Sequence, residues 1–155
     1  MLSIGDIVLV RGTGWLSIEI EEISHGEYSH TAGIVKPNEL IEAGWRRVQY
    51  QSIDYYNGRY DVFTCDQLTD EQRQRIADYA MKQVGKRYDY LLLLWEFIRY
   101  EFGLFLPYIN TDSVICSELW SDAYRSVGVD LCPGVKYPSP NELANSKLLR
   151  KVISR

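Results

Sequence analysis

The sequence has few of the residues from which disulfide and metal-binding frameworks are built. Among 155 residues there are only three cysteines and two histidines. Three cysteines are too few and odd in number for a disulfide framework, and neither a Cys-x-x-Cys nor a His-x-x-x-His spacing offers a metal site. We therefore expect free thiols in a reducing compartment, no metal and no cofactor. The residues concerned are Cys65, Cys116, Cys132, His25 and His30.

The sequence also shows no excess of basic residues and no long apolar run, and we expect no secretory leader. The formal net charge is −4, and without a basic stripe nucleic acid is not an expected partner. The stretch 90–102 is interrupted by charged residues well short of the ~20 apolar residues that an integral membrane segment needs. Residues 1–6 carry no basic segment before an apolar run, so we expect cytoplasmic synthesis without a signal peptide. Action outside the cell would then require release by lysis, packaging in a particle or another export route.

The composition that remains is that of one globular domain. Hydrophobic residues make up 46% of the chain and charged residues 25%, which suits a chain of this length with its own core. Repeats, low-complexity tracts and linkers are not evident. We expect a single domain over residues 1–155, while the oligomeric state stays open.

Short apolar runs separated by turn residues predict an antiparallel sheet. Residues 6–10 suit a buried strand between Gly5 and Gly12. Four further runs, predicted as strands of a meander, are separated by Lys36-Pro-Asn38, Gly44 and Asn57-Gly58. These four runs are 31–35, 39–43, 47–51 and 60–65.

Capping patterns predict helices after the strands. Thr69 and Gln72 form a capping box before a helical apolar pattern that ends near Gly85. A second helix is expected over 113–127 and a short third one over 139–146, and the ambiguous segment 15–23 is interpreted as helix. The predicted architecture is α+β, one antiparallel sheet with helices packed against it.

The second of these helices carries Cys116 near its start. A thiol with an ordinary pKa of about 8.5 is mostly protonated at neutral pH, and a helix N-terminus or a nearby imidazole lowers that value. A nucleophilic cysteine also needs a base within hydrogen-bond reach and a third group that orients the base. Of the two histidines, His25 lies beside Gly26 in a predicted turn, whereas His30 begins an apolar strand. We therefore favour His30 as the base.

A carboxylate in the next predicted strand completes the set. Glu42 interrupts an otherwise apolar strand, where a buried charge costs free energy unless it is paired. Adjacent antiparallel strands would place it beside His30. Each residue alone has a plainer interpretation, because free cysteines are often small buried hydrophobes, single histidines are usually structural and strand glutamates usually face water. Cys65 and Cys132 are interpreted in that plainer way, and the three residues together favour an active site.

Six short segments follow one another along almost the whole chain: 5–10 (Gly-Asp-Ile-Val-Leu-Val), 28–35 (Tyr-Ser-His-Thr-Ala-Gly-Ile-Val), 40–44 (Leu-Ile-Glu-Ala-Gly), 84–89 (Val-Gly-Lys-Arg-Tyr-Asp), 115–119 (Ile-Cys-Ser-Glu-Leu) and 139–143 (Ser-Pro-Asn-Glu-Leu). In order and spacing they resemble the YiiX/YebB-like branch of the NlpC-type cysteine hydrolases. His30 precedes Cys116, which is the order of the circularly permuted members, a group that includes the lecithin retinol acyltransferase family.

The resemblance implies a permuted papain-like fold, with the cysteine helix on an antiparallel sheet or small barrel. It implies Cys116 as nucleophile, His30 as general base and then acid, and Glu42 as the orienting member. Tyr88 matches a tyrosine that faces the reacting carbonyl in ordinary NlpC-type enzymes, so it is a candidate oxyanion donor together with the backbone N–H of Cys116.

The resemblance leaves three functions open. The first is a cysteine peptidase or amidase that forms a thioester on Cys116, with small peptides or amides of the murein type as substrates. The second is a lipid thioesterase or acyltransferase covered by residues 90–102. The third is a non-catalytic binding or structural module with the same fold. Because the lipid acyltransferases usually carry a second histidine where this chain has Glu42, amide hydrolysis is the favoured function.

Overall fold

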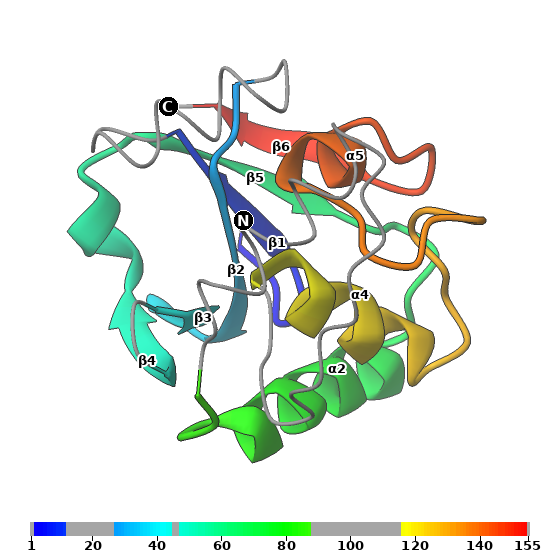
Figure 1. Cartoon of the computed structure of the whole chain (residues 1–155), viewed down its shortest axis with the longest axis horizontal. Coiled ribbons are helices and arrows are strands. Elements are labelled where there is room, and N and C mark those ends of the chain that lie inside the picture. Colours follow the sequence, from blue (N-terminus) through cyan, green and yellow to red (C-terminus); the bar gives the residue numbers. More distant parts are fainter. Residues whose placement is uncertain (1, 12–26, 45–46, 88–115, 155) are drawn as a thin grey trace, which may run out of the picture.

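The computed structural model describes residues 2–11, 27–44, 47–87 and 116–154 (Figure 1). The strands are β1 (Ile7–Val10), β2 (His30–Lys36), β3 (Glu39–Ala43), β4 (Val48–Ser52), β5 (Tyr60–Thr64) and β6 (Arg150–Ser154). The helices are the short 3-10 helix η1 (Ile53–Tyr56) and the α-helices α2 (Asp70–Gln83), α4 (Cys116–Arg125) and α5 (Pro140–Ala144). Within these residues no helix has the length and apolar character needed to cross a membrane.

The strands form one six-stranded antiparallel sheet in the order β4-β3-β2-β1-β5-β6. Strands β1 to β4 pair in sequence, as a meander does. The prediction that β5 extends this meander is wrong, because β5 pairs with β1 instead. Strand β1 is buried along its whole length, so its backbone groups need partners on both edges. After η1 the chain returns through the left-handed Asn57 and Gly58 and supplies the second partner.

The predicted helices are present where the structure describes them. Helix α2 begins with the expected capping box of Thr69 and Gln72, and the chain leaves it through Gly85, which has a φ of +92°. Helix α5 begins with a second capping box, formed by Ser139 and Glu142. Helix α4 ends at Arg125, short of the predicted residue 127, because the chain turns before Gly128. The predictions for 15–23, 90–102 and 113–115 fall outside the described residues.

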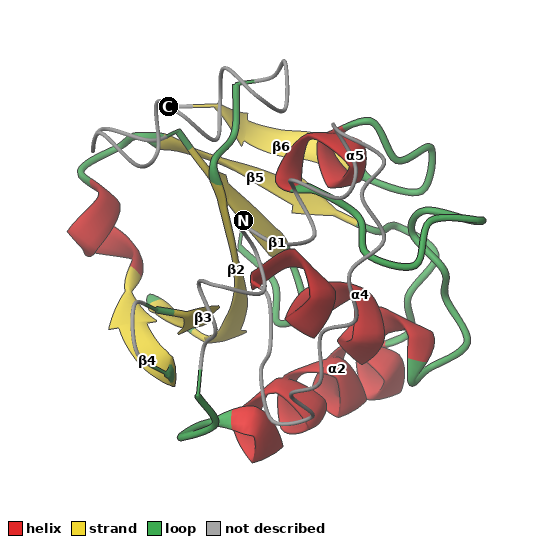
Figure 2. Ribbon diagram, viewed as in Figure 1, coloured by secondary structure: helices red, strands yellow, loops and turns green. Residues whose placement is uncertain are grey.

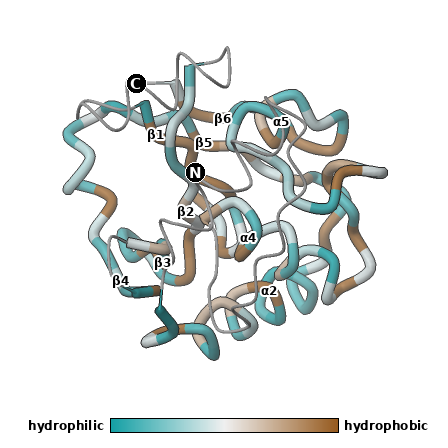
Figure 3. Tube along the Cα trace, viewed as in Figure 1, coloured by the Kyte–Doolittle hydropathy of each residue, from teal (hydrophilic) through white to brown (hydrophobic). Residues whose placement is uncertain are grey.

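The sheet, against which α2 and α4 lie (Figure 2), carries hydrophobic residues on both faces. Alternate residues of a strand point to opposite faces, so Ile7 and Leu9 join the cluster that includes the buried faces of α2 and α4, whereas Val8 and Val10 join a second cluster with η1. The first part of α2 is hydrophilic and teal in Figure 3, and the helix buries only a narrow apolar stripe. The fold is α+β, as predicted.

Helix α4 is fixed directly over β2 and β3. The fully buried Trp120 donates from its indole N–H to the carbonyl of Ile41, at 3.2 Å. Its ring lies against Gly33, where an added Cβ would come within 2.4 Å of a ring carbon. Glycine at this position therefore allows α4 to lie close to the two strands that carry His30 and Glu42.

Replacing Gly33 by alanine is expected to destabilise the protein by about 3 kcal/mol, because the new methyl group overlaps a ring that its own hydrogen bond holds in place. Chemical denaturation of the purified variant measures this change. A loss below about 0.5 kcal/mol would contradict the close packing of α4 on β2.

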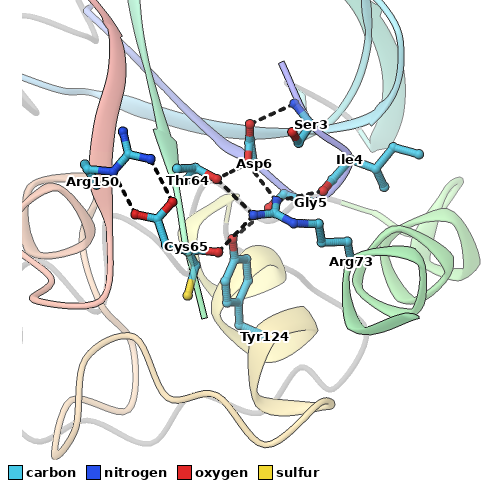
Figure 4. A network of polar contacts seen from close by, with 10 residues as sticks. Ser3, Ile4, Gly5, Asp6, Thr64, Cys65, Arg73, Tyr124 and Arg150 are labelled. Carbon is cyan, nitrogen blue, oxygen red and sulfur yellow. Dashed lines mark hydrogen bonds and ion pairs between the residues drawn. The ribbon is translucent and has the colours of Figure 1, made fainter. Parts of the chain in front are cut away.

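A second anchor joins α2 to the sheet through a buried ion pair (Figure 4). The Arg73 guanidinium lies 2.9 Å from Oδ1 of Asp6, whose side chain is 1% exposed. Thr64 donates its hydroxyl to the same carboxylate oxygen, at 2.7 Å, and accepts from Arg73. The remaining Arg73 bonds go to the carbonyls of Ile4 and Cys65. The start of β1, the end of β5 and helix α2 are thus held at one point.

Candidate active site

The hairpin of β2 and β3 brings His30 and Glu42 together. Glu42 pairs with Ala32 across the two strands, and His30 lies two residues before Ala32 on the same face. Nε2 of His30 is 2.8 Å from Oε2 of Glu42. The turn between the strands contains Asn38 in the left-handed conformation, with a φ of 61°. The structure thus places the two residues side by side, as the sequence predicted.

Three side chains surround the Glu42 carboxylate, which is 5% exposed. His30 and the phenol O–H of Tyr56 both bond to Oε2, and Gln49 donates from Nε2 to Oε1, at 3.0 Å. Burial raises the pKa of Glu42, but the hydrogen bond and charge of His30, followed by the bonds from Tyr56 and Gln49, outweigh it and lower the pKa to about 2. Glu42 is therefore ionised at neutral pH.

Cys116 is the first described residue of α4 and is 3% exposed. Burial raises the pKa of its thiol. The hydrogen bond and charge of His30 act in the opposite direction, as do the backbone N–H groups of Thr31 and Ser117. These interactions outweigh burial, so the pKa of Cys116 lies below the ordinary value of a thiol.

The imidazole of His30 shows the complementary shift. Burial lowers its pKa, whereas hydrogen bonds and charge interactions with Cys116 and then Glu42 raise it, to about 10. Because Nε2 is held by Glu42, Nδ1 is the ring nitrogen left for the thiol. Opposite shifts in two interacting groups favour a thiolate beside an imidazolium, which is the charge state of an activated cysteine.

The other two cysteines lie in different surroundings. Cys65 is fully buried in the core between the sheet and the helices. The thiol of Cys132 bonds to the carbonyl of Glu142, at 3.5 Å, and burial, followed by the charges of Glu142 and Asp130, raises its pKa to about 11. Neither thiol has an imidazole partner among the interactions of the described residues, so their predicted structural role fits these surroundings.

Sequence reasoning missed Tyr56 and Gln49. Gln49 lies directly opposite Glu42 in the pairing of β3 with β4, and its polar side chain in a predicted strand beside that glutamate was a usable signal. Tyr56 lies just before the Asn57-Gly58 turn, and no pattern around it distinguishes it from the other tyrosines, of which the chain has 12 in all. Tyr88, the candidate oxyanion donor, lies outside the described residues.

Asn141, in the segment 139–143, fixes the chain just before His30. Its side-chain oxygen accepts from the backbone N–H of Tyr28 and its amide group donates to the carbonyl of Tyr28, both at 3.0 Å. The phenol of Tyr28 in turn donates to the buried carboxylate of Asp61. The segment two residues before His30 is therefore held by its backbone and by its side chain.

The fold and this geometry define the class of the protein as α+β with a permuted papain-like fold. No protein family model matches the chain. The curated proteins likewise yield no match. Among solved structures, the chain is similar to the crystal structure of the metalloprotein YiiX from Escherichia coli O157:H7, with a TM-score of 0.75 and 20% sequence identity over 99% of this chain and 98% of that chain. The predicted resemblance to YiiX is thus confirmed at the level of the fold.

Proposed function

We propose that the protein is a cysteine hydrolase that cleaves an amide or peptide bond through a thioester on Cys116. The observation that carries the proposal is the arrangement of three side chains: His30 lies 2.8 Å from Glu42 and interacts with the buried Cys116 of α4. The lowered pKa of Cys116 and the raised pKa of His30 agree with this arrangement. A structural thiol would need no such partner. The similarity to YiiX supports the fold in which this arrangement sits.

In the proposed reaction the Cys116 thiolate attacks the carbonyl carbon of the substrate and forms a tetrahedral intermediate. As the C–N bond breaks, the His30 imidazolium donates its proton to the leaving amine, and the acyl group remains on sulfur as a thioester. Water then attacks the thioester carbonyl while His30 accepts its proton. The C–S bond breaks, the acid is released, and the thiolate and imidazolium are restored.

Small peptides or amides of the murein type are the proposed substrates, on the strength of the resemblance to NlpC-type hydrolases. YiiX is described as a metalloprotein, and a protein metal site needs several ligating side chains close together. In the part of the chain that the structure describes, no three His, Cys, Asp or Glu side chains gather as metal ligands would. These residues do not fit a metal, and no step of the proposal passes through one.

The proposal predicts selective reaction of Cys116 with iodoacetamide at about pH 6, where an ordinary thiol is almost wholly protonated. Because the pKa of Cys116 is lowered, its thiolate persists as the pH falls below the ordinary thiol pKa. Because the pKa of His30 is raised to about 10, its imidazolium persists up to that pH. Peptide mass spectrometry after partial alkylation measures the labelling of each cysteine.

Cys65 and Cys132 are internal controls in the same sample, and both are expected to stay unlabelled while Cys116 reacts. Equal labelling of the three, or labelling of Cys132 first, would contradict the proposal. A second sample, treated with p-nitrophenyl acetate, is expected to carry an acetyl group on Cys116 that water removes on standing. A long-chain acyl group that is accepted far better than acetyl would instead favour the lipid thioesterase or acyltransferase.

A further inference from the structure

Three donors hold the carboxylate of Glu42, and two of them, Tyr56 and Gln49, have no role in the proposed reaction. Oε2 accepts from His30 and from the phenol of Tyr56, while Oε1 accepts from Gln49. We propose that Tyr56 is a positioning residue of the site: it holds Oε2 of Glu42 so that this oxygen stays directed at Nε2 of His30. This inference rests on the proposed function and adds a fourth member to Cys116, His30 and Glu42.

Local structure fixes Tyr56 in place. Tyr56 is the last residue of η1, whose first turn is capped by Ser52, which accepts from the N–H of Asp54 at 3.3 Å. The helix ends at Asn57, in the left-handed conformation, and the N–H of Asn57 donates back to the carbonyl of Asp54. The side chain of Tyr56 is 6% exposed and packs in the cluster that contains Leu40 of β3.

Neighbouring rings further restrict the Tyr56 side chain. The ring of Tyr55 meets it edge-on with centroids 5.5 Å apart, and the ring of His30 lies 6.2 Å away at a tilt of 49°. A phenol held by its own helix, its cluster and these rings has little freedom to leave the carboxylate. The hydrogen bond to Glu42 is therefore preorganised and needs no rearrangement when substrate binds.

The chemistry of the phenol suits this role. Burial, followed by the charge and hydrogen bond of Glu42, raises the pKa of Tyr56 far above its ordinary value. The phenol therefore stays neutral and donates, and it never adds a second negative charge beside Glu42. A charge-assisted hydrogen bond of this kind is among the stronger ones in proteins, and it keeps the carboxylate both ionised and oriented.

Tyr56 acts through Glu42. Its hydroxyl bonds to the carboxylate, and the carboxylate in turn bonds to His30. The charged and titratable groups of the described residues that face this pair are His30 from β2, Cys116 from α4 and Tyr55 from η1. Loss of the phenol hydroxyl frees Glu42 to turn away from His30, so the imidazolium is less well fixed beside the thiolate. The thiolate should then take up a proton at a higher pH.

The test compares Tyr56→Phe with Tyr124→Phe. Tyr124 is a matched control because it is buried, like Tyr56, and its hydroxyl donates to the carbonyl of Gly5, at 2.7 Å, outside the site. The measurement is the rate of Cys116 alkylation as a function of pH. We expect the midpoint of the acid limb to rise by about one pH unit in Tyr56→Phe, a tenfold loss of thiolate on that limb, and to stay unchanged in Tyr124→Phe. The thermal midpoints of both variants should fall by similar amounts.

A double-mutant cycle makes the result specific to Glu42. In a Glu42→Gln background, Tyr56→Phe is expected to cause no further shift of the acid limb, because the carboxylate through which it acts is absent. The same shift in both backgrounds, or in Tyr124→Phe, would overturn the positioning role. The positioning role would also be overturned if the wild-type acid limb had a low midpoint and Tyr56→Phe left that midpoint unchanged. If the midpoint of the wild-type acid limb lay at the ordinary pKa of a thiol, the proposed function itself would be overturned.

Discussion

Replacement of His30 by glutamine is expected to abolish the reactivity of Cys116 at low pH. Glutamine can still bond to Glu42, but it cannot carry the proton that stabilises the thiolate. What remains is burial, the largest influence, which raises the pKa of the thiol, opposed only by the smaller effect of the backbone N–H groups of Thr31 and Ser117. The rate of alkylation should then rise about tenfold for each pH unit between about pH 6 and 8, whereas the wild-type rate should rise less steeply because the pKa of its thiol is lowered.

The same variant should lose turnover of an activated ester by at least about a thousandfold, because the base and the proton donor are one residue. Burst and steady-state release of p-nitrophenol measure acylation and deacylation separately. Thermal unfolding checks that the fold is intact, and His30→Asn is a second variant of smaller volume should glutamine disturb the hairpin.

His25→Gln is the matched control, because His25 is the other histidine of the sequence and belongs to a predicted turn. It should leave both the alkylation profile and ester turnover unchanged. A flat profile in His30→Gln, or a steep one in His25→Gln, would show that the base had been assigned to the wrong histidine.

The parts of the fold that were predictable are those that local chemistry determines. Capping boxes specify the starts of α2 and α5 through neighbouring residues. The pairing of β2 with β3 follows from a short turn between two apolar runs, and this pairing alone brings Glu42 beside His30. Two members of the candidate site, His30 and Glu42, therefore lie in a single hairpin.

The unpredicted parts depend on contacts between distant residues. The pairing of β5 with β1 joins segments about 50 residues apart, and a strand's sequence does not specify which neighbour it takes. Strand β6 was missed because Arg150 and Lys151 make it polar, and it lies at the edge of the sheet beside β5. The contribution of Tyr56 to the site likewise depends on how η1 folds back toward Glu42.

The position of Cys116 relative to the hairpin is the most distant of these relations. Helix α4 determines this position. The indole of Trp120 joins α4 to β3, and the lack of a side chain at Gly33 allows α4 to lie close to β2. Sequence patterns suggested a helix that begins near Cys116, but only the resemblance to a permuted fold suggested where that helix lies. Packing, rather than propensity, thus completes the site.

The second large effect is expected from Arg73→Met, which should destabilise the protein by about 4 kcal/mol. The substitution leaves the carboxylate of Asp6, 1% exposed, without the cation that lies 2.9 Å from it. A buried charge without a partner is costly, and the carbonyls of Ile4 and Cys65 lose donors at the same time. For a domain of this size the thermal midpoint should fall by about 10 °C.

The other Arg–Asp pair in Figure 4 provides the control. Arg150 binds Asp66 through two bonds of 2.7 Å, a shorter and more regular geometry than that of Arg73 and Asp6, but the Arg150 side chain is 61% exposed. Solvent screens such a pair, so Arg150→Met should shift the midpoint by less than about 2 °C. If bond geometry rather than burial set the contribution, the two variants would rank in the opposite order.

A third variant separates the cost of the unpaired charge from the loss of the arginine itself. In Asp6→Asn combined with Arg73→Met the buried group is neutral. Its carbonyl oxygen, in the place of Oδ2, can accept from the backbone N–H of Ser3, and its amide group, in the place of Oδ1, can donate to the hydroxyl of Thr64. The double variant should therefore be more stable than Arg73→Met alone, although it carries one more substitution. If the double variant were no more stable than Arg73→Met, the carbonyls left without donors, and not the charge of Asp6, would account for the loss. Arg73 would then hold α2 to the sheet mainly through its bonds to the backbone.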